Sequence, residues 1–260
     1  MIDAVLKASG FVDDKRASGR TAELLTVGVI AAQYFLKAHE RALCLMIRLG
    51  YIRGLSVSRF NRRWHALPEW LYGIISLVAE IYAQGEAFII DSMPLPGCKR
   101  ARASRCKKVR GKAFCGYCAA KHEKFFGWRL HLLCTSDGIP LSFDLWPAAE
   151  QDLTPIHELT VCLPQSATVF GDKGYVSDPD PDTLLAATGL RFVAVRPRNM
   201  TPNPWADEYD RRLYRRPIDT LYSQLQAMAV QPLHAPTNHA FDLKTYASLL
   251  ALPFTNIIPH

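Results

Sequence analysis

The fold of this chain is decided by two short segments, Ala87-Phe-Ile-Ile-Asp91 and Ala167-Thr-Val-Phe-Gly-Asp172, each of which ends in an aspartate. Both segments are rich in β-branched and aromatic residues, which is typical of buried strands. A lone carboxylate is unstable inside a sheet, so each aspartate needs a partner, a cation or water. If the two strands are neighbours, Asp91 and Asp172 form an oxygen-rich site of the kind that Mg²⁺ prefers.

The composition predicts a globular protein with a polyanionic partner. The chain has 260 residues, of which 49% are hydrophobic and 21% charged, so one or two domains with a real core are expected. Its net charge of +7 favours a polyanionic partner, and charge alone does not separate DNA from RNA or from an acidic surface. The longest apolar stretches are too short for a membrane span, and the chain does not start with a signal-like segment. Because seven scattered cysteines fit reduced thiols, we expect a cytoplasmic protein.

Residues 1–85 are predicted to form a helical DNA-binding domain. Apolar residues recur at near-helical spacing over 24–31 and 43–49, and residues 50–54 indicate a turn. Ser56 or Ser58 is a plausible cap of the next helix. A helix, a short turn and a basic helix are typical of DNA-reading bundles, and a helical bundle with a solvated charged face is the alternative. The basic helix carries three arginines on its polar face: Arg59, Arg62 and Arg63.

From residue 86 onward the pattern predicts alternating strands and helices. The expected strands are residues 87–91, 127–134, 140–146, 167–172 and 191–195. Helices are expected from Thr154 as a cap with Pro155 at the first position, from 180 to 189, and over about 213–228. The order βββαβαβα predicts an α/β domain over residues 86–228 with a ribonuclease H-like mixed sheet, in which the first and fourth strands are parallel neighbours. Residues 229–260 are expected to be a helical tail packed on this catalytic domain.

Four segments carry a resemblance to a known family: Phe88-Ile-Ile-Asp-Ser-Met-Pro-Leu95, Lys124-Phe-Phe-Gly-Trp-Arg-Leu-His131, Asp152-Leu-Thr-Pro-Ile-His-Glu158 and Val169-Phe-Gly-Asp-Lys-Gly-Tyr175. With these segments, the helical N-terminal part and Ser223-Gln-Leu225, the chain resembles the DDE transposases of bacterial insertion sequences, specifically the insertion-sequence 982 family. The likeness covers nearly the whole chain. The element from Gly171 to Tyr175, at this distance after an Ile-Asp-Ser strand, is its most specific part.

The resemblance implies DNA transposition in the bacterial cytoplasm, in association with the nucleoid. Such an enzyme binds the terminal inverted repeats of its element, hydrolyses a phosphodiester at each end and directs the freed 3′ hydroxyl at target DNA. It implies Mg²⁺ as cofactor, with Mn²⁺ as a possible substitute, and two ions about 3.5–4 Å apart. The implied partners are double-stranded DNA and further copies of the chain, because two ends must be held together. The implied catalytic residues and metal ligands are Asp91, Asp172 and Asp219.

The third acidic position departs from the family pattern. The family has glutamate there, whereas this chain reads Ile218-Asp219-Thr220. Aspartate is one methylene shorter, and a displacement of about 1 Å in a catalytic group can cost on the order of a hundredfold in rate. Pro217 would also perturb the helix unless the helix begins there. We expect metal binding to survive and cleavage to be impaired. The alternative is a solvated Asp219, with the third ligand supplied by one of three other acids: Glu150, Asp152 or Glu158.

Residues 99–112 hold eight basic residues and no acidic one, directly after the first predicted strand. We expect a flexible loop that contacts DNA phosphates, and a solvated charge run or a localisation-like signal is the alternative. The predicted DNA contacts are Lys99, Arg100, Arg102, Arg105, Lys107, Lys108, Arg110, Lys112 and Lys173, besides the three arginines of the basic helix. A second basic surface is expected from Arg196, Arg198, Arg211, Arg212, Arg215 and Arg216. Beside it, Trp205 is a candidate stacking or wedge residue, and it is equally compatible with a place in the core.

Cysteine and histidine give weaker signals. Cys115-Gly-Tyr-Cys118 has the spacing of half a zinc site, but seven residues separate Cys98 from Cys106, so reduced thiols are favoured. His131 and His157 are candidate donors near the active centre, and a satisfied core or surface histidine is the commoner case.

Two other function classes stay open. A catalytically decayed transposase that still binds DNA is favoured by Asp219 and Pro217. A ribonuclease H-like nuclease acting on RNA or hybrids would share the same pair of aspartates. Cleavage assays with different strands separate these possibilities.

Overall fold

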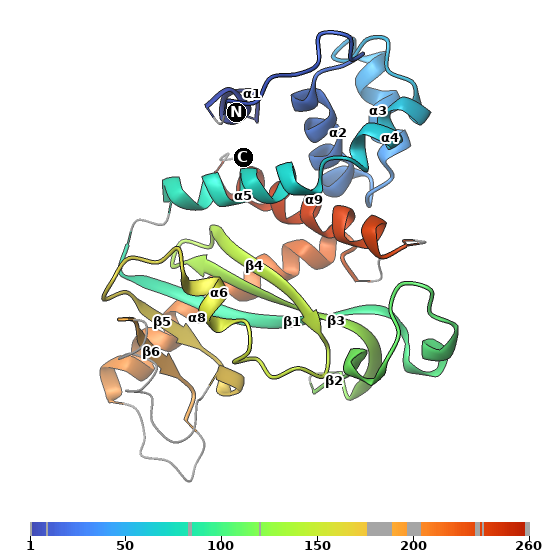
Figure 1. The fold of residues 1–260 in the computed structure, drawn as a ribbon. Coiled ribbons are helices and arrows are strands. Elements are labelled where there is room, and N and C mark those ends of the chain that lie inside the picture. The colour runs from blue at the N-terminus through green and yellow to red at the C-terminus, as the bar shows by residue number, and fades with distance from the viewer. Residues whose placement is uncertain are drawn as a thin grey trace. The chain divides into compact units, whose positions relative to one another are not determined.

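The computed structural model describes residues 2–8, 10–82, 85–119, 121–175, 189–196, 204–231, 235 and 237–257 (Figure 1). The chain divides into two compact units, one of Met1–Leu77 with Gln224–His260 and one of Val78–Ser223. No helix within the described ranges is long and apolar enough to cross a membrane. The helix predicted over 180–189 falls almost wholly outside the described residues, as does most of the basic loop that follows the fifth predicted strand.

Helices build the first unit, as the apolar spacing predicts. They are α1 (Ile2–Ala8), α2 (Thr21–Tyr34), α3 (His39–Arg48), α4 (Val57–Trp64), the first part of α5 (Pro68–Tyr82), the end of α8 (Trp205–Ala227) and α9 (Asn238–Ile257). The side chain of Ser56 accepts a hydrogen bond from the amide of Arg59 at 3.3 Å, which confirms Ser56 as the cap of α4. Gly28 lets α4 pack closely on α2, because a Cβ there would lie 2.1 Å from the Trp64 ring.

The C-terminal helix packs within this first unit. The side-chain amide of Gln33 on α2 donates hydrogen bonds to the carbonyl oxygen of Ala251 and to the hydroxyl of Thr255, at 3.2 and 2.9 Å. Phe241 and Leu250 on α9 are fully buried. We expected residues 229–260 to pack on the catalytic domain, whereas α9 packs against α2. Apolar periodicity identifies the buried face of a helix but not the surface that covers it.

The second unit is built on a six-stranded mixed sheet. Its strands are β1 (Ala87–Lys99), β2 (Cys115–Cys118), β3 (Glu123–Thr135), β4 (Pro140–Pro147), β5 (Thr168–Gly171) and β6 (Arg191–Ala194). The order is β2-β3-β1-β5-β6, and β4 pairs with β3. The β1–β3 and β3–β4 pairs are antiparallel, whereas β1–β5 and β5–β6 are parallel. This mixed α/β architecture is consistent with a ribonuclease H-like DDE domain.

Several elements differ from the sequence prediction in their extent. β1 and β3 are longer than expected, and β2 was not predicted. The helix α6 (Ile156–Thr160) is short, and Pro155 rather than Thr154 holds its N-cap position, without a side-chain cap. α8 begins at Trp205 and continues through Pro217, so the expectation that Pro217 starts or disrupts this helix is wrong. A proline removes one helical hydrogen bond, and the long helix around it tolerates that loss.

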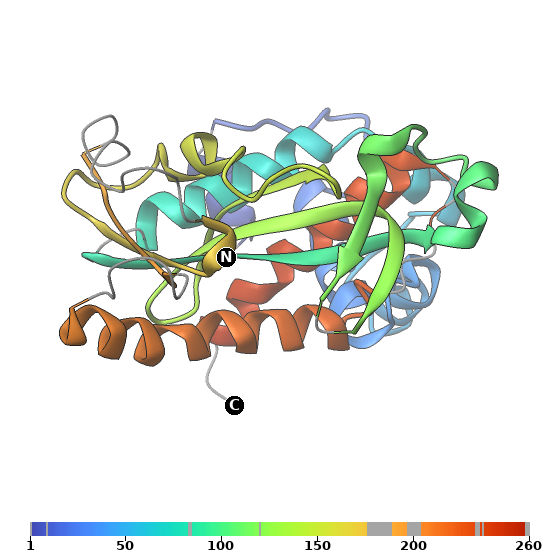
Figure 2. The same cartoon turned by 90° about the horizontal axis from the view of Figure 1, so that it is seen from below.

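Strand alternation gives β1 two chemically different faces. Phe88 and Ile90 belong to a buried cluster with Ile156 and Leu159 of α6. Ile89 and Asp91 line a pocket with residues of α8, to which Ile90 also contributes. Figure 2 shows α6 and α8 on opposite sides of the sheet. The candidate site therefore lies on the α8 face.

Candidate metal and catalytic site

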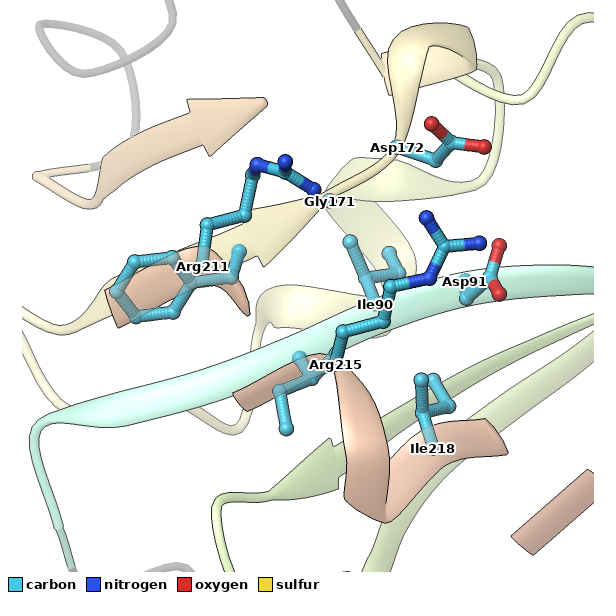
Figure 3. A pocket seen from close by; sticks show the side chains of 9 residues that line it. Ile90, Asp91, Gly171, Asp172, Arg211, Arg215 and Ile218 are labelled. Atoms are coloured by element: carbon cyan, nitrogen blue, oxygen red, sulfur yellow. The ribbon is translucent and has the colours of Figure 1, made fainter. Parts of the chain in front are cut away.

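The register of β1 and β5 brings Asp91 and Asp172 together. Ala87 pairs with Thr168 and Ile89 pairs with Phe170 in parallel register. The same offset continued by two residues sets Asp91 opposite Asp172, just past the end of β5. Both aspartates line one pocket, and Figure 3 shows their carboxylates on the same side of it. The parallel pairing expected from the sequence is thus observed, and it brings both acids to the point where β5 ends beside β1.

The environment of Asp91 disfavours its negative charge. Burial and, to a smaller extent, the nearby Asp172 raise the pKa of this carboxyl group to about 7. The Ser92 amide, which donates to Asp91 Oδ1 at 2.7 Å, and the Arg215 guanidinium act in the opposite direction. Asp91 is difficult to ionise beside Asp172. A divalent cation bound between the two side chains would stabilise the form in which both are ionised. Mg²⁺ commonly takes one or two carboxylates and keeps several waters, so this pair fits such an ion.

The helix α8 closes the other side of the pocket with two arginines. Arg211, Arg215 and Ile218 are spaced at i, i+4 and i+7, which places them on one side of the helix, and all three line the pocket (Figure 3). Arg211 is held by a pair of hydrogen bonds to Glu208 at 2.6 and 3.0 Å. We expected both arginines on a second basic surface, and their place beside the two aspartates was not predicted. Their i, i+4 spacing was the signal that could have found it.

Asp219 does not line the pocket. It follows the inward-facing Ile218 by one residue, which is a rotation of about 100° around the helix. Its side chain is 58% exposed, and its carboxylate lies 3.6 Å from the Arg215 guanidinium. It is still close enough to Asp91 to raise the pKa of that residue. Within the described part of the chain, no three His, Cys, Asp or Glu residues are arranged to hold a metal ion.

The alternative third acids also lie away from the pocket. Glu150 and Glu158 are exposed. Asp152 accepts a hydrogen bond from Ser92, the residue after Asp91, whose side chain points to the opposite face of β1. His157 is exposed on α6, whereas His131 is fully buried. Burial and the charge of Arg129 lower the pKa of His131 to about 4, so it is neutral near pH 7.

The basic segment after β1 is more ordered than expected. Residues Arg100–Arg105 and Lys112–Phe114 form 3₁₀ helices, so the prediction of a flexible loop is wrong for these parts. Lys108 is half-buried and donates to the carbonyl oxygen of Gly97 at 2.9 Å. The other basic residues of the segment are exposed: Lys99, Arg100, Arg102, Arg105, Lys107, Arg110 and Lys112. The side chain of Lys173 lies outside the described residues.

The three arginines of α4 differ in their surroundings. Arg59 and Arg62 are exposed. Arg63 is half-buried and donates to the carbonyl oxygens of Ser18 and Gly19 at 2.7 and 2.6 Å. Arg63 therefore fastens the loop before α2, and it is less suited to contact DNA than its two neighbours.

Trp205 lies on the surface and not in the core. Its side chain is 80% exposed, and its ring stacks on Tyr209 with centroids 5.5 Å apart. The core alternative is therefore wrong, and the stacking role stays a prediction. All seven cysteines are free thiols, with Cys115 and Cys118 at the two ends of β2.

Comparison with known proteins gives one result. A family model described as a transposase DDE domain matches residues 82–235. This span is more than half of the chain and contains the pocket with both aspartates. No curated protein and no solved structure matched the chain.

Proposed function

This chain belongs to the transposase DDE domain family, and we propose that it is an insertion-sequence transposase that cleaves DNA at the ends of its element and joins them to a target. The insertion-sequence 982 family is the group we propose, on the four segments that carry the resemblance. The observation that carries the activity is the meeting of Asp91 and Asp172 in one pocket, with Asp91 within β1 and Asp172 directly after the parallel strand β5.

We propose that Asp91 and Asp172 hold Mg²⁺, with Mn²⁺ as a substitute. When bound, such an ion lowers the pKa of an attacking water and stabilises the leaving oxygen of a phosphodiester. The protein's own contribution is geometric and electrostatic. Asp91 is held within β1 and Asp172 directly after β5, on neighbouring strands. Asp91 is half-buried, which lowers the dielectric around it and strengthens its interaction with a cation, whereas Asp172 is exposed.

The two pocket arginines support a phosphodiester substrate. A guanidinium group presents a planar pair of donors that fits phosphate oxygens, and Arg211 and Arg215 bring two such groups beside the aspartates. The seven exposed basic residues of segment 99–112 and the exposed Arg59 and Arg62 supply sequence-independent attraction to the DNA backbone. We propose double-stranded DNA as the partner, and a homo-oligomer that holds two DNA ends.

Asp219 is proposed as the third acid, in a position reached only after a rearrangement. Its carboxylate is tied to Arg215, so a phosphate that draws Arg215 away would release it. Because aspartate is short for this position, cleavage by this chain is expected to be slow.

The experiment uses a supercoiled plasmid that carries the coding region together with its natural flanking DNA. Purified protein with Mg²⁺ or Mn²⁺ should nick or linearise this plasmid at the flanks, whereas Asp91→Asn should not. Asp137→Asn, an identical change at an exposed turn residue between β3 and β4, is the matched control. Cleavage by Asp91→Asn at the wild-type rate would contradict the proposal.

A second candidate function is a DNA-binding protein that no longer cleaves. It is favoured by the position of Asp219 outside the pocket. It predicts tight binding of the flanking DNA without any nicking, in either cation, by the wild-type protein and by Asp219→Glu. A parallel assay on an RNA–DNA hybrid tests the nuclease alternative, since cleavage of the hybrid alone would point to a ribonuclease.

A further inference from the structure

We propose that Asp152 is a positioning residue, whose carboxylate braces β1 against the turn after β5 and thereby sets the separation of Asp91 and Asp172. This inference rests on the proposed function, because the geometry of that pair matters for the cleavage reaction. It assigns a role to the segment at residues 152–158, which contributes nothing to the pocket itself.

One end of the brace is on β1. Asp152 Oδ1 accepts a hydrogen bond from the hydroxyl of Ser92 at 3.0 Å. The guanidinium of Arg129 on β3 lies 3.5 Å from the same carboxylate oxygen and 3.3 Å from the Ser92 hydroxyl. Ser92 follows Asp91 directly, so a contact that fixes Ser92 also fixes the backbone that presents Asp91.

The other end of the brace is the turn that carries Asp172. A Cβ on Gly174 would lie 2.2 Å from Asp152 Oδ2, so the carboxylate packs directly against the backbone of this glycine. Gly174 belongs to the short 3₁₀ helix Lys173–Tyr175, and the Tyr175 amide donates to the Asp172 carbonyl at 3.0 Å. The position of Asp152 therefore limits where this turn, and Asp172 with it, can lie.

A second contact joins the same elements. The Tyr175 hydroxyl is hydrogen-bonded to His131 Nδ1 at 3.0 Å, and both side chains are buried. His131 pairs with Ser92 across β1 and β3, and its Nε2 lies 4.0 Å from Asp152. Since His131 is neutral, this approach is not an ion pair, and the charged partner of Asp152 is Arg129.

The sheet alone does not hold the two acids in register. The β1–β5 ladder pairs residues only as far as Ile89 with Phe170, and both aspartates lie beyond that point. Asp91 and Ser92 are paired with β3, so the part without a ladder is the one between β1 and the turn that carries Asp172. Asp152 contacts both sides of this part, from the face opposite the pocket. Residues that orient metal ligands in this way typically change metal affinity or activity by roughly 10–100-fold when they are removed.

The test compares four variants. Asp152→Ala removes the brace, Asp152→Asn keeps an acceptor for Ser92 but not the charge, and Gly174→Ala displaces the brace from the other end. Glu158→Ala is the matched control, since Glu158 is an exposed acid of the same segment. Each variant is measured for melting temperature, Mn²⁺ affinity, affinity for the flanking DNA, and cleavage rate at saturating DNA.

The expected result is a selective loss. Asp152→Ala and Gly174→Ala should lower both Mn²⁺ affinity and the cleavage rate at least about tenfold. DNA affinity should stay within about twofold of the wild type, because backbone contacts dominate it. Asp152→Asn should recover part of the loss, and Glu158→Ala should match the wild type. A residue with only a structural role would instead reduce melting temperature and DNA affinity together with the rate. That pattern, or wild-type Mn²⁺ affinity and rate in Asp152→Ala, would overturn the inference.

A readout without any reaction separates this inference from the proposed function. Hydrogen exchange at the Tyr175 amide should accelerate at least about tenfold in Asp152→Ala and stay unchanged in Glu158→Ala. If the wild-type protein cleaves no DNA, the proposed function fails while exchange and Mn²⁺ affinity still judge the brace. Unchanged exchange in Asp152→Ala would reject the brace even in an active enzyme.

Discussion

The two faces of β1 in the sheet unit carry opposite kinds of polar chemistry. On the α8 face, Asp91 and Asp172 share a pocket with two arginines, Arg211 and Arg215. On the α6 face, the polar side chains are tied to one another by short contacts, from Ser92 through Asp152 to Arg129. Asp91 thus belongs to a face of β1 that can bind a ligand, whereas the adjacent Ser92 belongs to a network on the other face that supports this site. Four sets of variants test how sharp this division is.

The largest effect is expected from the acids of the α8 face. Asp172→Asn should lower metal-dependent cleavage by roughly a thousandfold or more, as should Asp91→Asn, since both carboxylates serve one ion site. The double variant should be no worse than either single variant, because groups that act as a unit are not additive. Rate measurements on the flanking-DNA plasmid check this. An additive double loss would show that the two acids act separately.

The next largest effect is expected from lengthening the third acid. Asp219→Glu should raise the cleavage rate by about tenfold to a hundredfold, because one more methylene brings the carboxylate nearer to the pocket. Asp210→Glu, on the same helix, is the control and should leave the rate unchanged. Rates measured under single-turnover conditions decide the matter. An equal rate for wild type and Asp219→Glu would show that aspartate is adequate at this position.

The pH dependence of stability should have opposite signs on the two faces. The pKa of His131 is lowered to about 4 in the folded protein. Its contribution to the free energy of unfolding is therefore complete above about pH 6.5 and is lost as the pH falls toward 4. The pKa of Asp91 is raised to about 7 in the folded protein. Its contribution to the free energy of unfolding is therefore complete at acid pH and is lost as the pH rises from about 4 to 7. Between pH 7 and pH 5 each residue should change the free energy of unfolding by about 2 kcal/mol, in opposite directions.

Two variants measure this difference by urea unfolding at pH 7 and pH 5. Relative to wild type, His131→Asn should gain about 2 kcal/mol on acidification and Asp91→Asn should lose about as much. Comparing the change with pH removes the constant cost of each substitution. Parallel pH profiles for wild type and both variants would contradict the assigned surroundings of these residues.

The smallest effect is expected from a pair of neighbouring arginines. Arg211→Lys should lower the cleavage rate by about tenfold, because lysine cannot present two parallel donors to a phosphate. Arg212→Lys should stay within about twofold, since Arg212 is 75% exposed and lies outside the pocket, although it also bonds Glu208. Equal losses in the two variants would indicate that the bond to Glu208, and not the pocket, matters.

Local sequence patterns predicted the elements that hold the two acids. The strands β1 and β5 could be predicted from neighbouring residues alone, because a run of β-branched and aromatic residues indicates a buried strand whichever strand it pairs with. The parallel pairing of β1 with β5 followed from the order of elements, and with it the meeting of Asp91 and Asp172. The cap of α4 at Ser56 is equally local, because it needs only an amide three residues away.

The support of the site could not be predicted in this way. Asp152 is bonded to Ser92 and packs on Gly174, residues that only the folded sheet brings near it. No periodicity marks such a contact. The orientation of Asp219 was also hidden, because it depends on the rotation of a helix that begins at Trp205, several residues before the predicted start. Long-range packing fixes both features.

The division of the chain into units has a consequence for its biosynthesis. The helical unit is made of the first 77 residues and of residues from Gln224 onward, with the sheet unit inserted between them. Translation from the N-terminus therefore releases every strand of the sheet before α9, on which α2 packs, has left the ribosome. The helical unit therefore completes its packing last, and a polypeptide that ends between α8 and α9 carries Asp91 and Asp172 but lacks the helix that packs on α2.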